Sequence, residues 1–196
     1  MSAWVVVLLK GFSDAKTRLA PALDAPRRIE LARRNAALAL QAAGAGDRVL
    51  AVAGGPDSAA LAAELGIEVL REAEPRGQNP AAALGLARAE SEGAEAVLLL
   101  SSDLPLVTSA ALAGMLARGA ALPAPAVLAA PATGRGGTNA LYLKPPGACG
   151  LHFGDESLRK FEADARARGA RFELFEAPEL ALDLDEPSDL ELLEVS

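Results

Sequence analysis

Three aspartates have the residue type and spacing to bind a metal ion. Asp103 follows an apolar run at residues 97–100, and ligands of open α/β sheets bind at the carboxyl ends of such strands. Asp183 and Asp185 are two residues apart on a second expected strand, so both side chains should point to the same side of it. Together the three carboxylates would form an oxygen site suited to Mg²⁺, although Asp103 taken alone could equally cap a turn.

A group of basic residues follows the first predicted strand. Lys10, Lys16 and Arg18 lie where this strand gives way to a helix. Cations and free backbone N–H groups at such a junction suit a polyphosphate. The stretch has neither the G-x-x-x-x-G-K-[ST] pattern nor the G-x-G-x-x-G pattern. A solvated surface loop is the alternative, but the position after a strand favours phosphate contact.

A short stretch before a predicted helix could read a nucleotide base. Gln78 and Asn79 carry paired donor and acceptor groups that can bind a base edge, and Gly77 would let the backbone approach the base. Asn79 could also be the N-cap of a helix that begins at Pro80, and both roles can hold together.

Two loops rich in small residues could bind a second anion. Residues 134–139 (GRGGTN) and 154–157 (GDES) each offer backbone N–H groups and a hydroxyl group, from Thr138 and Ser157. Arg135 would add a cation to the first loop. Ser157 has the alternative role of a helix cap.

Strands alternate with helices along the chain, and this order predicts a three-layer α/β/α domain with a mostly parallel mixed sheet. We see no internal repeat or linker, so residues 1–196 are expected to form a single domain. Strands are predicted at residues 3–9, 48–53, 67–70, 96–100, 126–130, 139–143, 171–175 and 180–184, and helices at 24–43, 58–65, 80–89, 109–119, 156–168 and 187–193. Glu186 and Asp189 are expected to stabilise the N-terminus of the last helix through their negative charge.

The composition excludes several classes of site and partner. The one cysteine, Cys149, excludes an internal disulfide and a cysteine-based zinc site, and the one histidine, His152, excludes a histidine cluster. Any metal should therefore be a hard cation with oxygen ligands. Cys149 is interpreted as structurally neutral and His152 as a packed core histidine. A net charge of −7 argues against a nucleic-acid surface.

The same sequence gives no sign of membrane association. Its longest apolar runs are far below the ~20 residues that span a bilayer, and the N-terminal stretch has no basic region and no cleavage site. We therefore expect a cytoplasmic protein. Exposed strand edges and an alanine-rich surface would permit a homodimer.

Six short motifs occur in order along nearly the whole chain. They are KGFSDAKTRLAP at 10–21, GQN at 77–79, SDLP at 102–105, GTNAL at 137–141, F-G-x-x-S at 153–157 and LDLDEP at 182–187. With them the chain resembles the 2-phospho-L-lactate and phosphoenolpyruvate guanylyltransferases of coenzyme F-420 biosynthesis. These belong to a wider group with the nucleotide-diphospho-sugar transferase (glycosyltransferase-A-like) fold, which includes the molybdenum-cofactor nucleotidyltransferases. Leu9 and Gln78 depart from the family, which often has Pro and Leu at these places.

The resemblance implies a role for each matching position. The aspartates would hold Mg²⁺, the basic loop would face the phosphates of GTP, and residues 77–79 would face the guanine. A small phosphorylated three-carbon acid would be the second substrate. The implied residues are Asp103, Asp183, Asp185 and Lys16 for catalysis, Lys10, Lys16, Arg18, Gly77, Gln78 and Asn79 for the nucleotide, and Thr138, Gly154 and Ser157 for the acceptor phosphate.

The expected reaction transfers GMP from GTP to the acceptor phosphate and releases pyrophosphate. A phosphomonoester is largely dianionic at neutral pH, so no general base is required. Two alternatives stay open. One is a nucleotidyltransferase for another phosphorylated acceptor, such as 3-phosphoglycerate, a sugar phosphate or molybdopterin. The other is a catalytically silent nucleotide-binding module, which would bind GTP without releasing pyrophosphate.

Overall fold

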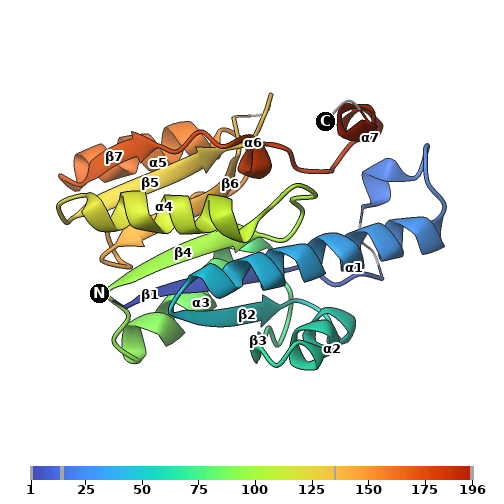
Figure 1. Cartoon of the computed structure of the whole chain (residues 1–196), viewed down its shortest axis with the longest axis horizontal. Helices are drawn as coiled ribbons and strands as arrows, with labels where there is room; N and C mark the ends of the chain where they lie inside the picture. The colour runs from blue at the N-terminus through green and yellow to red at the C-terminus, as the bar shows by residue number, and fades with distance from the viewer. Residues whose placement is uncertain (1, 14–15, 135, 195–196) are drawn as a thin grey trace.

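A seven-stranded sheet forms the centre of the structure, a computed structural model that describes residues 2–13, 16–134 and 136–194 (Figure 1). The strands lie in the order β3-β2-β1-β4-β6-β5-β7. Neighbours are parallel except that β6 runs antiparallel to both β4 and β5. The predicted mostly parallel mixed sheet is therefore confirmed. The strands are β1 (Ala3–Leu9), β2 (Arg48–Ala53), β3 (Glu68–Arg71), β4 (Ala96–Ser101), β5 (Ala126–Pro131), β6 (Thr138–Lys144) and β7 (Arg171–Leu174).

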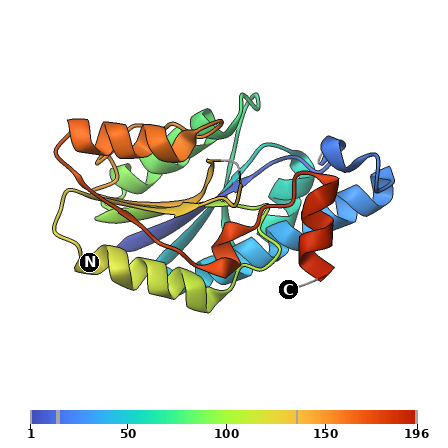
Figure 2. The ribbon, with the colours of Figure 1, turned by 90° about the horizontal axis from the view of Figure 1, so that it is seen from above.

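Helices cover both faces of the sheet, as the three-layer prediction requires. The α-helices are α1 (Ala25–Ala42), α2 (Pro56–Glu64), α3 (Gln78–Ser91), α4 (Ser109–Ala121), α5 (Ser157–Ala167), α6 (Pro178–Ala181) and α7 (Pro187–Glu194), with short 3₁₀ helices at Thr17–Leu19 and Ala43–Ala45. Figure 2 shows α1 and α4 on one side of the sheet and α3 and α5 on the other. The hydrophobic core divides accordingly into two clusters, with α1, α2 and α4 over one face and α3 and α5 over the other.

The topology brings three functional segments to one edge of the sheet. All seven residues of β1 are buried, as is usual for a parallel strand covered on both faces, and β4 lies beside it. The carboxyl ends of both strands therefore meet, with Leu8 opposite Ser101. Because β6 runs the other way, its first residue, Thr138, lies at this same edge. Lys10, Asp103 and Thr138 thus surround one site.

One predicted strand is absent. Residues 180–184 were expected to form a strand, but Pro178 begins the short helix α6 and the chain then continues without strand pairing. Side-chain and loop hydrogen bonds fix this segment instead. The Asn139 amide donates to the carbonyl oxygens of Leu180 and Ala181 at 2.9 and 3.2 Å, and the Thr133 N–H donates to Ala181 at 2.8 Å.

The helix starts match the sequence prediction in part. Asp24 caps α1 and Thr108 caps α4, each through its side chain, close to the predicted helix starts at 24 and 109. The alternative cap roles of Asn79 and Ser157 do not hold, since Gly77 precedes α3 and Glu156 precedes α5.

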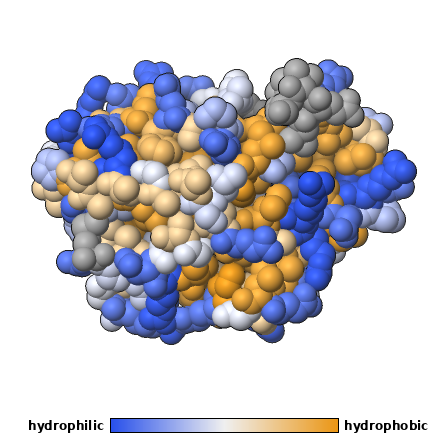
Figure 3. Space-filling view, in the orientation of Figure 1, coloured by the Kyte–Doolittle hydropathy of each residue, from blue (hydrophilic) through white to orange (hydrophobic). Residues whose placement is uncertain are grey.

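The surface of the face that carries α1 and α4 has apolar residues across its middle and hydrophilic residues gathered toward its rim (Figure 3). Within the described part of the chain, no helix combines the length and apolar character needed to cross a membrane.

Candidate active site

Lys10 lines four adjoining cavities at the edge of the sheet where β1 and β4 end, three large ones and a small one of about 40 Å³. The apolar cavity, of about 190 Å³, is lined by Leu8, Pro75, Ala81 and their neighbours. The basic cavity, of about 530 Å³, is lined by Lys10, Lys16, Arg18 and glycines. The mixed cavity, of about 260 Å³, is lined by Asp103, Asp183, Asp185, Thr138, Gly154 and Ser157, among others. The site thus offers adjacent apolar, cationic and hydroxyl-bearing surfaces.

Asp103 is held between two lysines. Lys16 Nζ lies 2.8 Å from Asp103 Oδ1, and Lys10 Nζ lies 3.1 Å from Oδ2. Burial raises the pKa of Asp103, but the charges and hydrogen bonds of the two lysines outweigh it and hold this pKa below its ordinary value. The carboxylate is therefore fully ionised at neutral pH.

The two lysines differ in freedom. The Lys16 side chain is only 2% exposed, and its ammonium also donates to the Leu184 carbonyl oxygen at 2.6 Å. The Lys10 side chain is 68% exposed, and the charge of Asp103 raises its pKa. Lys16 is thus a fixed part of the site, whereas Lys10 has room to turn toward a bound anion.

The loop that carries Lys16 is positioned by an aspartate of the neighbouring strand connection. The Asp57 carboxylate accepts hydrogen bonds from the backbone N–H groups of Phe12 and Ser13, at 2.8 and 3.2 Å. Lys16 itself has a left-handed backbone, with φ of 57°, which turns its side chain into the site. Local hydrogen bonding and one strained residue therefore bring this basic loop over the end of β1.

Asp183 and Asp185 reach the mixed cavity without the predicted strand. The backbone N–H of Leu184 donates to the Asp103 carbonyl oxygen at 3.2 Å, and the Leu184 side chain is buried. The flanking aspartates both line the mixed cavity, so the predicted alternation holds although the strand does not. Arg18 lies 3.6 Å from Asp185 Oδ2.

Asp189 serves the start of α7, in agreement with the sequence prediction. Its carboxylate accepts the backbone N–H groups of Asp185 and Glu186, at 2.8 and 2.7 Å. These bonds fix the backbone of the segment that carries Asp185.

The three aspartates line one cavity without forming a tight triad. Among the described residues, the group of His, Cys, Asp or Glu side chains that brings three ligand atoms within 4.8 Å of one another is Cys149, His152 and Asp164. Their oxygens are nonetheless the donors that a hard divalent cation prefers.

The Cys149 group is explained by hydrogen bonds around Asp164. Asp164 Oδ2 accepts from Gly150 N at 2.6 Å, from Cys149 Sγ at 3.2 Å and from Arg168 Nε at 2.9 Å. His152 is half-buried rather than in the core, and its ring packs edge-on against Phe161. These contacts hold the segment that leads to the Phe153-Gly154 loop against α5.

The residues predicted for the acceptor come together. Ser157 donates to Thr138 Oγ1 at 3.1 Å, and both side chains are buried. Gly154, with φ of 120°, lines the same mixed cavity and accepts the Ser157 N–H at 3.1 Å. Arg135 lies outside the described residues.

Of the three residues predicted to bind the base, two line the apolar cavity and the third does not. Gly77 and Gln78 line the apolar cavity, and the φ of 102° at Gly77 is a conformation that favours glycine. Asn79 instead binds the backbone of Phe153, donating to its carbonyl at 3.0 Å and accepting its N–H at 2.8 Å. Both ends of this amide are occupied, so Asn79 is not free to bind a base edge.

Sequence reasoning missed Glu72 and Leu8, which also line the apolar cavity. Leu8 was assigned to the buried strand, where its hydrophobicity is fully accounted for. Glu72 opens the polar loop before α3, and its position at the end of β3 was the signal that could have identified it.

Sequence comparison places this chain among known proteins. The family model described as "Guanylyl transferase CofC like" matches residues 3–195. The chain belongs to this family. The phosphoenolpyruvate guanylyltransferase of Rubrobacter xylanophilus is 42% identical over 100% of this chain and 95% of that protein. The 2-phospho-L-lactate guanylyltransferase of Methanothermobacter thermautotrophicus is 32% identical over 97% and 83%, and the 3-phospho-D-glycerate guanylyltransferase of Phenylobacterium zucineum is 35% identical over 95% and 87%.

Solved structures support the fold. A protein described as a nucleotide-diphospho-sugar transferase, from Desulfovibrio desulfuricans G20, matches with a TM-score of 0.78 and 17% identity, over 98% of this chain and 87% of that one. A nucleotidyl transferase from Methanothermobacter matches with a TM-score of 0.68 and 18% identity, over 98% and 95%. The predicted nucleotide-diphospho-sugar transferase fold is confirmed.

Proposed function

We propose that this member of the CofC-like guanylyl transferase family transfers GMP from GTP to the phosphate of phosphoenolpyruvate or 2-phospho-L-lactate, in coenzyme F-420 biosynthesis. The observation that carries the proposal is the position of Lys10, which lines the apolar, basic and mixed cavities together. A nucleoside triphosphate needs an apolar surface for its base and cations for its phosphates. A phosphorylated acid needs a further anion site beside them.

The basic cavity suits the triphosphate. Lys10, Lys16 and Arg18 line it, together with glycines that allow close approach to the backbone. Lys10 is exposed and can turn from Asp103 to a phosphate oxygen, whereas Lys16 keeps its place. These cations would steady the leaving pyrophosphate.

The mixed cavity suits the acceptor phosphate. The hydroxyls of Thr138 and Ser157 and the backbone at Gly154 offer hydrogen bonds to its oxygens. The acceptor phosphate is largely dianionic at neutral pH, so it can attack the α-phosphorus without a general base. Catalysis then rests on positioning the two substrates and neutralising their charge.

We propose Mg²⁺ as the cofactor, held by Asp103, Asp183 and Asp185. The fit rests on chemistry, because three carboxylates line one cavity at the phosphate site and hard cations prefer oxygen ligands. When bound, such an ion supplies charge neutralisation on phosphate oxygens. The protein would hold the three carboxylates in place, and Lys10 would turn away from Asp103 toward a phosphate oxygen.

Pyrophosphate release tests the reaction. GTP is incubated with phosphoenolpyruvate, 2-phospho-L-lactate or 3-phosphoglycerate separately, with Mg²⁺ or with EDTA. The downstream deazaflavin acceptor and transferase are added because the guanylylated product can be labile. Release with one of the first two acceptors supports the proposal, and loss with EDTA supports the cofactor. Asp183→Asn should abolish this release with folding intact, and near-normal turnover would remove Asp183 from the metal site.

A second candidate acceptor is 3-phosphoglycerate, because the Phenylobacterium relative is named for it and is 35% identical. Pyrophosphate release with 3-phosphoglycerate alone would establish it as the acceptor and exclude phosphoenolpyruvate and 2-phospho-L-lactate. Release with none would leave the fold standing and point to another acceptor or nucleotide. A homodimer also stays a prediction, and sedimentation velocity of the purified chain tests it.

A further inference from the structure

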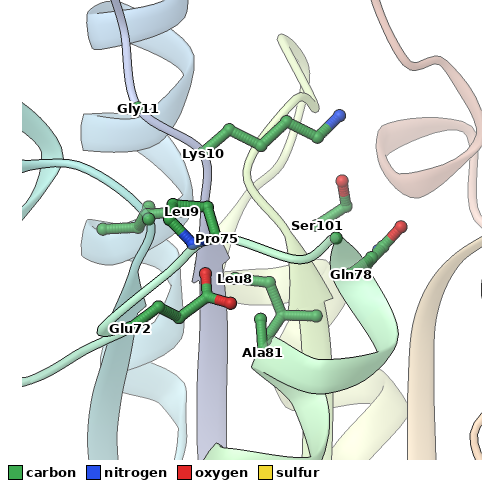
Figure 4. Close-up of a pocket in the computed structure, with 11 residues that line it drawn as sticks. Leu8, Leu9, Lys10, Gly11, Glu72, Pro75, Gln78, Ala81 and Ser101 are labelled. Atoms are coloured by element: carbon green, nitrogen blue, oxygen red, sulfur yellow. The ribbon is translucent and has the colours of Figure 1, made fainter.

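Glu72 stands at the end of β3 with its carboxylate in the apolar cavity. Figure 4 shows the carboxylate pointing toward Leu8 and Ala81, beside Pro75. The backbone N–H of Glu72 donates to the Ala53 carbonyl oxygen at 3.1 Å, which fixes the start of the side chain.

Lys10, a cation that lines the same cavity, pairs with Asp103 rather than with Glu72. Among the described residues no Lys or Arg forms a salt bridge with Glu72. Burial raises the pKa of its carboxyl, and only the backbone N–H of Arg76 acts in the opposite direction. A half-buried acceptor that lacks a charged partner, inside an apolar cavity, suits a ligand that brings hydrogen-bond donors.

A glycine makes the room for this arrangement. A Cβ atom at Gly54 would lie 3.2 Å from Glu72 Oε2 and 3.3 Å from the Leu9 carbonyl oxygen. The absence of that atom lets the carboxylate lie close to Gly54, the residue after β2.

The chemistry of the bases then decides between ligands. A carboxylate offers two acceptor oxygens side by side. Guanine presents two adjacent donors, N1–H and the N2 amino group, on its pairing edge. Adenine and cytosine place an acceptor beside their amino group, so one oxygen of a carboxylate would face a lone pair. Uracil offers one N–H between two carbonyls.

We propose that Glu72 determines the preference for guanine, accepting hydrogen bonds from N1–H and the N2 amino group of a base that lies between Leu8, Pro75 and Ala81. This inference rests on the proposed use of a nucleoside triphosphate, and it deepens that proposal by naming the residue that selects the base. With Glu72 in this role, base recognition does not need Asn79, whose amide is bonded to the backbone of Phe153. A good bidentate contact discriminates against the wrong base by about 5- to 150-fold.

The test compares nucleotides on Glu72→Gln. The amide that replaces the carboxylate has one donor and one acceptor, which matches adenine better than guanine. We expect the wild-type protein to prefer GTP over ITP, which lacks the N2 amino group, and over ATP. In Glu72→Gln the kcat/KM ratio of GTP to ITP should fall toward one, and the ratio of GTP to ATP should fall at least tenfold.

The matched control is Glu74→Gln, which makes the same change in charge two residues away. Glu74 is 73% exposed and pairs with Arg76. It should leave both ratios unchanged. An equal fall in kcat/KM for all three nucleotides in Glu72→Gln would overturn the proposal. The same change in the kcat/KM ratios in Glu74→Gln would also overturn it.

Binding without an acceptor separates this inference from the proposed reaction. Calorimetric titration of the wild-type protein and of Glu72→Gln with GTP, ITP and N1-methyl-GTP needs no turnover. Weaker binding of both analogues to the wild-type protein, with the difference from GTP lost in Glu72→Gln, supports the role of Glu72 even where no acceptor releases pyrophosphate. Equal affinity for the three nucleotides, or no binding of GTP, contradicts it.

Discussion

The side-chain amide of Asn79 makes a two-point hydrogen-bonded contact with the backbone of Phe153, donating at 3.0 Å and accepting at 2.8 Å. Asn79 lies in the first turn of α3, next to Gln78 of the apolar cavity, and Phe153 precedes Gly154 of the mixed cavity. One side chain therefore joins the part of the site proposed for the base to the part proposed for the acceptor.

Asn79→Ala should raise the acceptor KM more than the GTP KM. The change frees the Phe153-Gly154 loop, while Gly77 and Gln78 keep their own backbone positions. Loss of two hydrogen bonds should also cost about 1–3 kcal/mol of unfolding free energy. Steady-state kinetics and urea unfolding check both effects, and a larger rise in the GTP KM would place Asn79 at the nucleotide.

Asp103→Asn should destabilise the fold as well as remove a carboxylate. Lys16 is buried against Asp103, and breaking such a pair from one side costs about 3–5 kcal/mol. Because the folded-state pKa of Asp103 is lowered, its stabilisation is present above the unfolded pKa of about 3.9 and is lost as pH falls through the folded pKa. Urea unfolding at a series of pH values should show that the difference in unfolding free energy between Asp103→Asn and the wild-type protein shrinks from pH 7 to pH 3. A difference that stays constant would contradict this account.

Ser157→Ala should raise the acceptor KM with little change in the GTP KM. The variant removes a buried hydroxyl that lines the mixed cavity and donates to Thr138. Ser109→Ala changes an exposed serine at the first position of α4 and serves as the control. Equal increases in both KM values would move Ser157 out of the acceptor site.

Cys149 should resist thiol reagents in the native protein. Burial, together with the nearby Asp164, raises the pKa of its thiol to about 12, so almost no thiolate is present at neutral pH. Titration with a chromogenic disulfide should show slow reaction in buffer and full reaction of the one thiol in denaturant. Fast native labelling would show that this segment opens readily.

Gly85→Ala should lower the melting temperature. A Cβ at Gly85 would lie 2.4 Å from Val6 Cγ1 and 3.1 Å from Val52 Cγ2, so α3 would have to move away from the sheet at a cost of about 1–3 kcal/mol. Gly44→Ala, where a Cβ would meet nothing within 4 Å, is the control. Equal melting temperatures for the two variants would show that α3 is loosely packed.

The sequence predicts those features that depend on local pattern. The apolar run of β4 and the turn after it placed Asp103 correctly at the end of a strand, because burial on both faces leaves a clear signal. The segment at 180–184 was misread because its alternating Leu and Asp residues imitate a half-buried strand. Its real supports, Asn139 and the Asp103 carbonyl oxygen, are distant in sequence. Glu72 was missed for a similar reason, since a cavity is formed by several segments at once.

The hydrogen bond between Lys16 and the Leu184 carbonyl oxygen joins positions 168 residues apart, and Lys16 also binds Asp103. During synthesis, β1 to β4 emerge first and can begin to pair while the rest of the chain is still being made. The bond that locks Lys16 in place has no partner until residue 184 leaves the ribosome. Nascent chains can therefore acquire most of the sheet before Asp103, Asp183 and Asp185 line one cavity, and that cavity is complete only with the last part of translation.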